Sequence, residues 1–408
     1  MTAFRVALEL ARWLTGTWLL WRIRTCGAEI CDEGAGRADL GEERGRVTVV
    51  IPARNEEENL PHLLASLSGQ GPRPAEVIVV DDESLDSTAA VARSGGGTVV
   101  AAGPLPAGWT GKSWACATGV EASAALRTPR GKPFEARADA ATAPARAGGA
   151  GTAPAGAAVT LVFLDADTWV RPGGLSRLLG EHRRRGGLIS VQPFHVTRRP
   201  YESLSAFFNV VSMMGVGTFT PRREARATGA FGPCLITTAS DYATAGGHSH
   251  PDVRGRVVED VALAQRFADA GLPVSVLGGR GTISFRMYPE GLGQLVEGWT
   301  KNFAAGASSA GPATFVLISL WLSGCISAAW SLPAPAAVAV YLAYAGQLAW
   351  MLKRIGRFGW WSAALYPVPL AFFLVVFARS LVLTHVRGEV RWRGRIICTR
   401  SSRPSSRP

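Results

Sequence analysis

The stretch LVFLDADTWV, residues 161–170, decides the fold that we expect for the rest of the chain. Its first four residues form an apolar run with the length and composition of a buried β-strand. Asp165 and Asp167 follow at once, so two carboxylates stand where such a strand ends. Hard oxygen ligands at the carboxyl end of a parallel strand suit Mg²⁺ or Mn²⁺ beside a diphosphate. Taken alone, these residues fit a metal site and a solvated turn after a strand equally well.

Two strand and helix pairs precede this stretch. Residues 47–52, VTVVIP, form a β-branched strand, and the acids after Asn55 predict a helix start there. Residues 76–80 form a second strand, which ends in Asp81 and Asp82 and is followed by a helical pattern. This alternation is typical of a doubly wound parallel α/β sheet, in which ligands bind at the carboxyl ends of the strands. We therefore expect the polar residues after both strands to lie close to Asp165.

A lysine opens the helix that is predicted after a third strand, residues 98–101. The segment Gly111-Lys112-Ser113 is not a P-loop, because the upstream glycine of that motif would fall at Pro106. A lysine at a helix start can nevertheless reach a diphosphate. Lys112 is therefore a candidate phosphate ligand.

A further acidic pair, Glu259 and Asp260, stands at the head of the helical pattern GRVVEDVALAQR, residues 255–266. The positive end of a helix dipole favours carboxylates, so an acidic first turn is also ordinary helix chemistry. Taken alone, such a pair is more often a helix start than a functional site.

Charge and hydropathy point to a membrane rather than to a nucleic acid. The formal net charge is +12, yet we find no nucleic-acid motif, and the basic residues flank apolar runs, as at the cytoplasmic face of a bilayer. Residues 313–332 and 334–352 are each long enough to cross a bilayer of about 30 Å, and Lys353 after the second places that end in the cytoplasm. A third run, residues 363–378, contains two prolines, and its topology stays open.

These patterns predict four regions. Residues 1–25 would be an interfacial amphipathic anchor or a poor span, because the uncharged run there is too short for a clean transmembrane helix. The segment 123–158 is rich in Ala, Gly, Pro and Arg and predicts a disordered surface insertion. The predicted regions are a membrane anchor and linker (1–46), a catalytic domain containing that insertion (47–310), transmembrane helices (311–385) and a basic tail (386–408).

Five segments, taken in order, are more specific than any of them alone. They read IPARNEEENL, VVDDESLDST, FLDAD, VVEDVALAQRF and EGWTKNF. This series resembles the large inverting A-type glycosyltransferase family, and within it the membrane-bound bacterial branch of hopene-associated and diaponeurosporenoate glycosyltransferases. The resemblance runs over residues 47–307, apart from the insertion. It implies a Rossmann-like α/β catalytic domain followed by a C-terminal transmembrane region.

The resemblance also implies roles for single residues. Asp167 would bind a divalent metal, Mg²⁺ or Mn²⁺, and Asp260 would be the general base, with Glu259 orienting it. Trp299 would lie on the acceptor or product side. Gln294 is followed by Leu-Val-Glu-Gly-Trp, which lacks the arginine and the spacing of the QxxRW motif of processive members, so we expect transfer of one sugar. The residues expected to bind the nucleotide sugar are Pro52, Ala53, Asn55, Glu56, Asp81, Asp82, Lys112 and Asp165.

The activity implied by the resemblance is transfer of a single hexose, with inversion, from a UDP-sugar donor to a lipid acceptor such as a carotenoid or a hopanoid. The enzyme would be a multi-pass protein of the cell membrane with a cytoplasmic catalytic domain, and it would not bind nucleic acid. An acceptor hydroxyl would need Asp260 as a base, whereas a carotenoid carboxylate would need it less. Two alternatives stay open: transfer to another isoprenoid or a glycerolipid, and a non-catalytic membrane scaffold.

Overall fold

The computed structural model describes residues 3–26, 47–126, 159–221, 229–306, 310–331, 335–384, 389–392 and 395–398. The chain divides into two compact units. The sheet unit comprises Cys26–Gln192 and Phe231–Ser275, and the helical unit comprises Met1–Thr25, Pro193–Ala230 and Val276–Pro408. Both units thus include residues from the predicted catalytic domain. Most of the predicted insertion, residues 127–158, lies outside the described residues.

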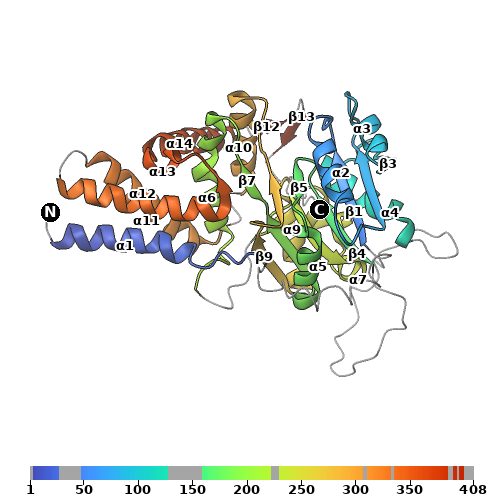
Figure 1. Ribbon diagram of the computed structural model, residues 1–408, viewed down its shortest axis with the longest axis horizontal. Coiled ribbons are helices and arrows are strands. Elements are labelled where there is room, and N and C mark those ends of the chain that lie inside the picture. Colours follow the sequence, from blue (N-terminus) through green and yellow to red (C-terminus); the bar gives the residue numbers. More distant parts are fainter. Residues whose placement is uncertain are drawn as a thin grey trace, which may run out of the picture. The chain divides into compact units, whose positions relative to one another are not determined.

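A mixed β-sheet forms the centre of the sheet unit (Figure 1). Strands β1, β2, β3 and β4 run parallel, as the strand and helix alternation predicts. Strand β8 runs antiparallel to both β4 and β6, so the sheet is not parallel throughout. In spatial order the strands are β3 (Thr98–Ala101), β2 (Glu76–Asp81), β1 (Val47–Ala53), β4 (Thr160–Leu164), β8 (Cys234–Thr238), β6 (Leu188–Gln192) and β9 (Val274–Gly278).

Helices pack against this sheet through small and apolar residues. A Cβ atom added to Gly119 of α4 would lie 2.5 Å from Cγ1 of Val50 in β1, so only glycine permits this close approach. Short strand β5 (Thr168–Val170) follows β4 after the Asp165 turn. The helices of the unit are α2 (Leu60–Ser68), α3 (Thr88–Ser94), α4 (Gly111–Ala122), α5 (Gly174–Arg185), α7 (Ala239–Thr244), α8 (Pro251–Arg254) and α9 (Glu259–Asp269).

The helix that was predicted to start at Asn55 starts five residues later, at Leu60. Asn55 has a φ of +53°, in the left-handed region, which a helix cannot include. Its side-chain Oδ1 instead accepts a hydrogen bond from the backbone N–H of Leu85, 2.8 Å away. The acidic segment after β1 is therefore a loop that is tied to the loop after β2.

The helical unit contains α1 (Ala3–Leu19), which runs alongside α11 (Pro312–Trp330) (Figure 1). In a buried contact, Trp321 of α11 donates its Nε1–H to Oε1 of Gln347, at 2.8 Å, and Gln347 donates to the carbonyl oxygen of Trp13, at 2.6 Å. One amide thus ties three helices together. The other helices are α6 (Ala206–Gly215), α10 (Leu292–Gly306), α12 (Pro335–Ile355), α13 (Trp361–Ala364) and α14 (Pro367–Val382).

Short strands complete this unit. Strand β6 ends before Pro193, which has no N–H for a sheet hydrogen bond, and β7 (Phe194–Val196) follows it. β7 pairs in parallel with β10 (Ile283–Phe285) and with β11 (Gly356–Arg357). β12 (Glu389–Trp392) and β13 (Arg395–Cys398) form an antiparallel pair in the predicted tail.

Within the described part of the chain, one helix, Pro312–Trp330, is long and apolar enough to cross a membrane by length and composition. Helix α12, the second expected span, does not meet the same criterion, and its C-terminal end carries Lys353 and Arg354. Helix α14 is apolar but shorter. Of the helices that were expected to cross the membrane more than once, only α11 meets this criterion within the described residues.

Candidate active site

Loops after β1 and β2 bring the first group of expected donor-binding residues together. Ala53 and Asp81 are direct partners in the register of the two strands. The guanidinium of Arg54 donates to the carbonyl oxygen of Asp82 at 2.8 Å, and the carboxylate of Asp82 is buried. The backbone N–H of Glu56 donates to Oγ1 of Thr88, at 2.8 Å. Pro52, Ala53, Asn55, Glu56, Asp81 and Asp82 thus form one edge of the sheet unit.

Lys112 lies in the first turn of α4, which begins after an N-cap at Thr110. Its Nζ lies 2.7 Å from Oδ1 of Asp165 and 3.2 Å from Oε1 of Glu259. Burial by itself would lower the pKa of Lys112, but the two carboxylates outweigh it and raise that pKa well above the usual value. Lys112 is therefore a permanent cation that links the Asp165 turn to the start of α9.

Asp165 and Asp167 stand at the carboxyl end of β4, as the sequence predicts. The backbone N–H of Asp165 donates to the carbonyl oxygen of Pro233, at 3.0 Å, which joins the turn to the segment before β8. Both aspartates are half-buried. In the described part of the chain, no group of three His, Cys, Asp or Glu side chains could hold a metal. Two carboxylates fit Mg²⁺ or Mn²⁺, which usually take their other ligands from substrate phosphates and water.

The backbone of Gly232 lies between the side chains of Lys112 and Asp260. A Cβ atom added there would lie 2.9 Å from Nζ of Lys112 and 3.2 Å from Oδ2 of Asp260. The backbone of Gly232 also hydrogen-bonds to the Asp260 carboxyl. Ser190 of β6 holds this segment, since its Oγ accepts from the N–H of Phe231 at 2.6 Å. The absence of a side chain at residue 232 thus lets the lysine and the carboxyl come close together.

Asp260 lies in the first turn of α9, where its Oδ1 accepts from the N–H of Val261 at 2.9 Å. Burial, together with the neighbouring Glu259 carboxylate, raises the pKa of Asp260 to about 7. The charge of Lys112 and the two backbone N–H groups act in the opposite direction. A carboxyl with a pKa near neutrality can take up and release a proton at physiological pH.

The structure brings four predicted residues, Lys112, Asp165, Glu259 and Asp260, into one cluster. We call this set the acid–lysine cluster. Sequence reasoning missed both Gly232 and the ion pair between Lys112 and Glu259. The signal for Gly232 was a run of small residues before β8, which by itself indicates only close packing.

Trp299 belongs to the helical unit, whereas the four residues of the cluster belong to the sheet unit. It is 4% exposed, its ring stacks on Phe208 with centroids 4.7 Å apart, and its Nε1 donates to Oγ of Ser205 at 2.9 Å. These contacts give Trp299 a packing role in the core of the helical unit. Its expected place on the acceptor side stays a prediction.

Comparisons with known proteins agree on one kind of activity. Residues 48–124 match the sequence model of the family described as "Glycosyl transferase family 2". A 4,4'-diaponeurosporenoate glycosyltransferase from Staphylococcus aureus strain USA300 is 35% identical over 363 residues, which cover 86% of this chain and 87% of the relative. The corresponding protein of strain MRSA252 is 34% identical over the same length.

Solved structures give a looser likeness. A mannosyltransferase from Pyrobaculum calidifontis in complex with GDP-Man and Mn²⁺ matches with a TM-score of 0.46 and 17% identity, over 93% of this chain and 94% of the other. A glucosyl-3-phosphoglycerate synthase from Mycobacterium tuberculosis matches with a TM-score of 0.38 and 20% identity, over 66% and 81%. Neither likeness bears on the donor or the acceptor of this chain.

Proposed function

The chain belongs to glycosyl transferase family 2, and from this premise we propose that it transfers a single hexose, with inversion, from a UDP-hexose to a membrane lipid that carries a carboxyl group. It is a glycosyltransferase with a Rossmann-like, mixed α/β A-type fold. The observation that carries the transfer step of this proposal is the acid–lysine cluster, in which a permanent cation and a carboxyl of near-neutral pKa lie on either side of Gly232.

The donor would lie along the strand ends of the sheet unit. Asp81 and Asp82 suit the nucleoside, because carboxylates accept hydrogen bonds from ribose hydroxyls and from the uracil N–H. Asp167, with Asp165 beside it, would hold Mg²⁺ or Mn²⁺. The bound ion supplies positive charge that stabilises the leaving diphosphate. The proposed metal site is supported by the oxygen ligands that two carboxylates, Asp165 and Asp167, offer at the end of β4.

Lys112 would assist departure of UDP. Its ammonium is held by Asp165 at 2.7 Å and Glu259 at 3.2 Å, so its position is fixed before the donor binds. A preorganised cation stabilises developing negative charge without reorganisation during the reaction. Glu259 would serve as a positioning residue for this lysine, in addition to its effect on the pKa of Asp260.

Asp260 would act on the acceptor. With a pKa near 7, its carboxylate can take the proton of an attacking hydroxyl, and single displacement at the anomeric carbon then inverts that centre. An acceptor that is already a carboxylate needs no such proton transfer. In that case the ionised Asp260 would repel the acceptor, so the protonated form, which dominates below pH 7, suits a carboxylate acceptor better.

The acceptor class is proposed from the relative and from the helical unit. The Staphylococcus aureus relative is named for 4,4'-diaponeurosporenoate, a carboxylate. Helix α11 is long and apolar enough to cross a membrane, which suits an acceptor dissolved in a bilayer. We propose that α11 and α12 form a membrane hairpin and that the sheet unit faces the cytoplasm, where UDP-sugars are made.

The proposal is tested by sugar transfer with full-length protein in detergent micelles. UDP-glucose, Mn²⁺ and either a polyene carboxylic acid or its alcohol would be supplied, and products followed by mass spectrometry. We expect the acid to receive one hexose as an ester. Asp260→Asn should lower transfer to the alcohol by roughly 10²–10⁴-fold, the usual contribution of a positioned base, and lower transfer to the acid much less.

Asp252→Asn provides a matched control, because its side chain is 67% exposed on α8 of the same unit and lies outside the cluster. This variant should behave as wild type with both acceptors. Absence of transfer to any lipid, with UDP still bound, would favour the non-catalytic scaffold. An Asp260→Asn protein that is fully active with the alcohol would contradict the assignment of the base.

A further inference from the structure

Basic side chains gather where α1 and α12 end. The C-terminal ends of the two helices meet, because Nη1 of Arg354 donates to the carbonyl oxygen of Trp21 at 3.2 Å. The chain beyond Trp21 then joins β9, through a bond from the N–H of Gly278 to the carbonyl oxygen of Arg24 at 2.8 Å. Residues that are distant in sequence thus come to one end of the helical unit.

Two more segments reach the same place. β11 follows α12 directly and pairs with β7, and Oγ1 of Thr197 donates to the carbonyl oxygen of Arg357 at 2.8 Å. The guanidinium of Arg280, after β9, is close enough to Arg354 to repel it. We call the exposed cations of these segments the basic belt: Arg22, Arg198, Arg280, Lys353 and Arg357.

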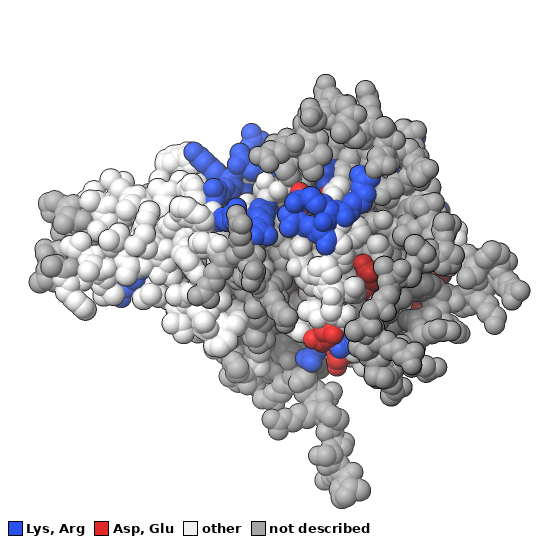
Figure 2. All heavy atoms as spheres, turned by 90° about the horizontal axis from the view of Figure 1, so that it is seen from below, with Lys and Arg blue, Asp and Glu red and all other residues white. Residues whose placement is uncertain are grey.

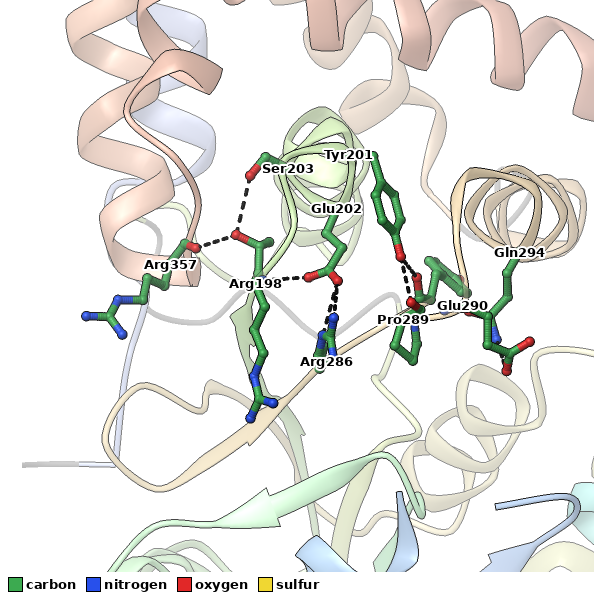
Figure 3. Close-up of polar contacts among 11 residues, drawn as sticks. Arg198, Tyr201, Glu202, Ser203, Arg286, Pro289, Glu290, Gln294 and Arg357 are labelled. Carbon is green, nitrogen blue, oxygen red and sulfur yellow. Dashed lines mark hydrogen bonds and ion pairs between the residues drawn. The ribbon is translucent and has the colours of Figure 1, made fainter. Parts of the chain in front are cut away.

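The positive charge of the belt is not cancelled by the carboxylate in its midst. Glu202 is fully buried and pairs with Arg286, whose Nε lies 3.1 Å from Oε1. Figure 3 shows Glu202 turned towards Arg286, while the side chains of Arg198 and Arg357 extend away from it. Both of these arginines are exposed, and neither guanidinium forms an ion pair within the described residues. On the face of the molecule that Figure 2 shows, Lys and Arg side chains are grouped in one area.

A largely apolar surface adjoins these cations. Helices α1, α11 and α12 expose large apolar side chains, among them Phe4, Leu10, Leu14, Phe315, Val316 and Leu342. Trp21 and Trp360, at the border, are 53% and 80% exposed. Tryptophan prefers the headgroup level of a bilayer, and Lys and Arg prefer its anionic cytoplasmic surface. An acidic protein would match the charge but not the adjoining apolar surface.

We infer that the basic belt is a docking surface for the headgroups of anionic phospholipids, with Trp21 and Trp360 at headgroup level. This inference rests on the proposed membrane association but not on the proposed sugar transfer. Each Lys or Arg near an anionic surface contributes about 1 kcal/mol of attraction. Because about 1.4 kcal/mol corresponds to a tenfold change in the dissociation constant, each cation strengthens association by roughly fivefold. Loss of three belt cations should therefore weaken selective lipid binding by roughly 100-fold.

The test uses the full-length chain in detergent, without donor or acceptor, so its failure is distinct from failure of the proposed reaction. Mixed micelles with tail-labelled phosphatidylglycerol or phosphatidylcholine would be titrated at low and high salt. We expect wild type to prefer phosphatidylglycerol by at least tenfold, and salt to reduce the preference. Arg22→Gln/Arg280→Gln/Arg357→Gln should abolish it, whereas the triple Lys variant at these positions should keep it.

A control variant removes the same charge from exposed arginines of the sheet unit, Arg73→Gln/Arg93→Gln/Arg171→Gln. It should retain the wild-type preference. Equal binding of both lipids by wild type would overturn the inference. So would a belt variant that still selects phosphatidylglycerol, or a control variant that loses the preference to the same extent as the belt variant.

Discussion

Replacement of Gly232 by alanine should lower turnover by about 10²-fold and leave the fold intact. The added Cβ would lie 2.9 Å from Nζ of Lys112 and 3.2 Å from Oδ2 of Asp260. Non-bonded heavy atoms settle at about 3.5 Å or more, so Nζ of the lysine must move by about 0.6 Å and the Asp260 carboxyl by about 0.3 Å, which changes their relative position by on the order of 1 Å. The backbone at Gly232 does not have a φ in the left-handed region, so alanine itself is not strained there.

The two consequences of this movement differ in size. Nζ is the distal atom of a long, flexible side chain, so the cost in the free energy of unfolding should be about 1 kcal/mol. The same movement pulls Nζ away from Asp165, now at 2.7 Å, and from Glu259, now at 3.2 Å. A misplacement of about 1 Å in a reactive arrangement can lower the rate by about 10²-fold. Turnover should therefore fall far more than stability.

The assay compares turnover at saturating UDP-glucose with thermal unfolding of the same preparations. Gly180→Ala is the matched control, because its added Cβ in α5 would meet no atom within 4 Å and alanine favours a helix interior. The control should keep wild-type turnover with equal or higher stability. Wild-type turnover in Gly232→Ala would refute the view that close contact at this glycine positions Lys112 and Asp260.

Three further predictions concern the metal, the proton and the insertion. Asp167→Asn should weaken UDP binding in the presence of Mn²⁺, as measured by calorimetry. UDP binding that needs no metal and is equal in wild type and variant would exclude Asp167 as the metal ligand. Because the pKa of Asp260 rises from 3.8 in the unfolded chain to about 7 when folded, the stability that it contributes is complete at low pH and is lost as pH rises through 7. The melting temperature of Asp260→Asn relative to wild type should thus increase from pH 5 to pH 8, and a constant difference would contradict the raised pKa. Replacement of residues 127–158 by a short Gly/Ser linker should preserve UDP binding, since their composition cannot bury a core; loss of binding would mean that the segment belongs to the site.

Local patterns were enough to predict most of the sheet unit. The β-branched run before Asn55 and the apolar run before Asp165 form β1 and β4, because burial between helices selects these residues. The helix start at Lys112 was also confirmed, at α4. The start of α2 was predicted wrongly, because Asn55 bonds to the loop after β2, and periodicity carries no information about such a contact.

The cluster could be predicted only in part. Asp165, Glu259 and Asp260 stand at element ends that the sequence indicates, so their chemistry was readable. The pairing of Lys112 with Glu259 joins α4 to α9, and the antiparallel course of β8 sets the position of Gly232. Neither feature leaves a local pattern, because both depend on the order of strands in the sheet. The basic belt likewise depends on contacts between helix ends.

The central claim, transfer of one hexose to a lipid carboxyl group, is tested most directly by mass spectrometry of lipid extracts. Cells that produce a polyene carboxylic acid would express either the wild-type chain or Asp167→Asn. We predict a new lipid in the wild-type extract that carries one hexose as an alkali-labile ester, and its loss in the variant. A wild-type extract without any hexosyl lipid, or with a chain of several hexoses on the lipid, would contradict the account.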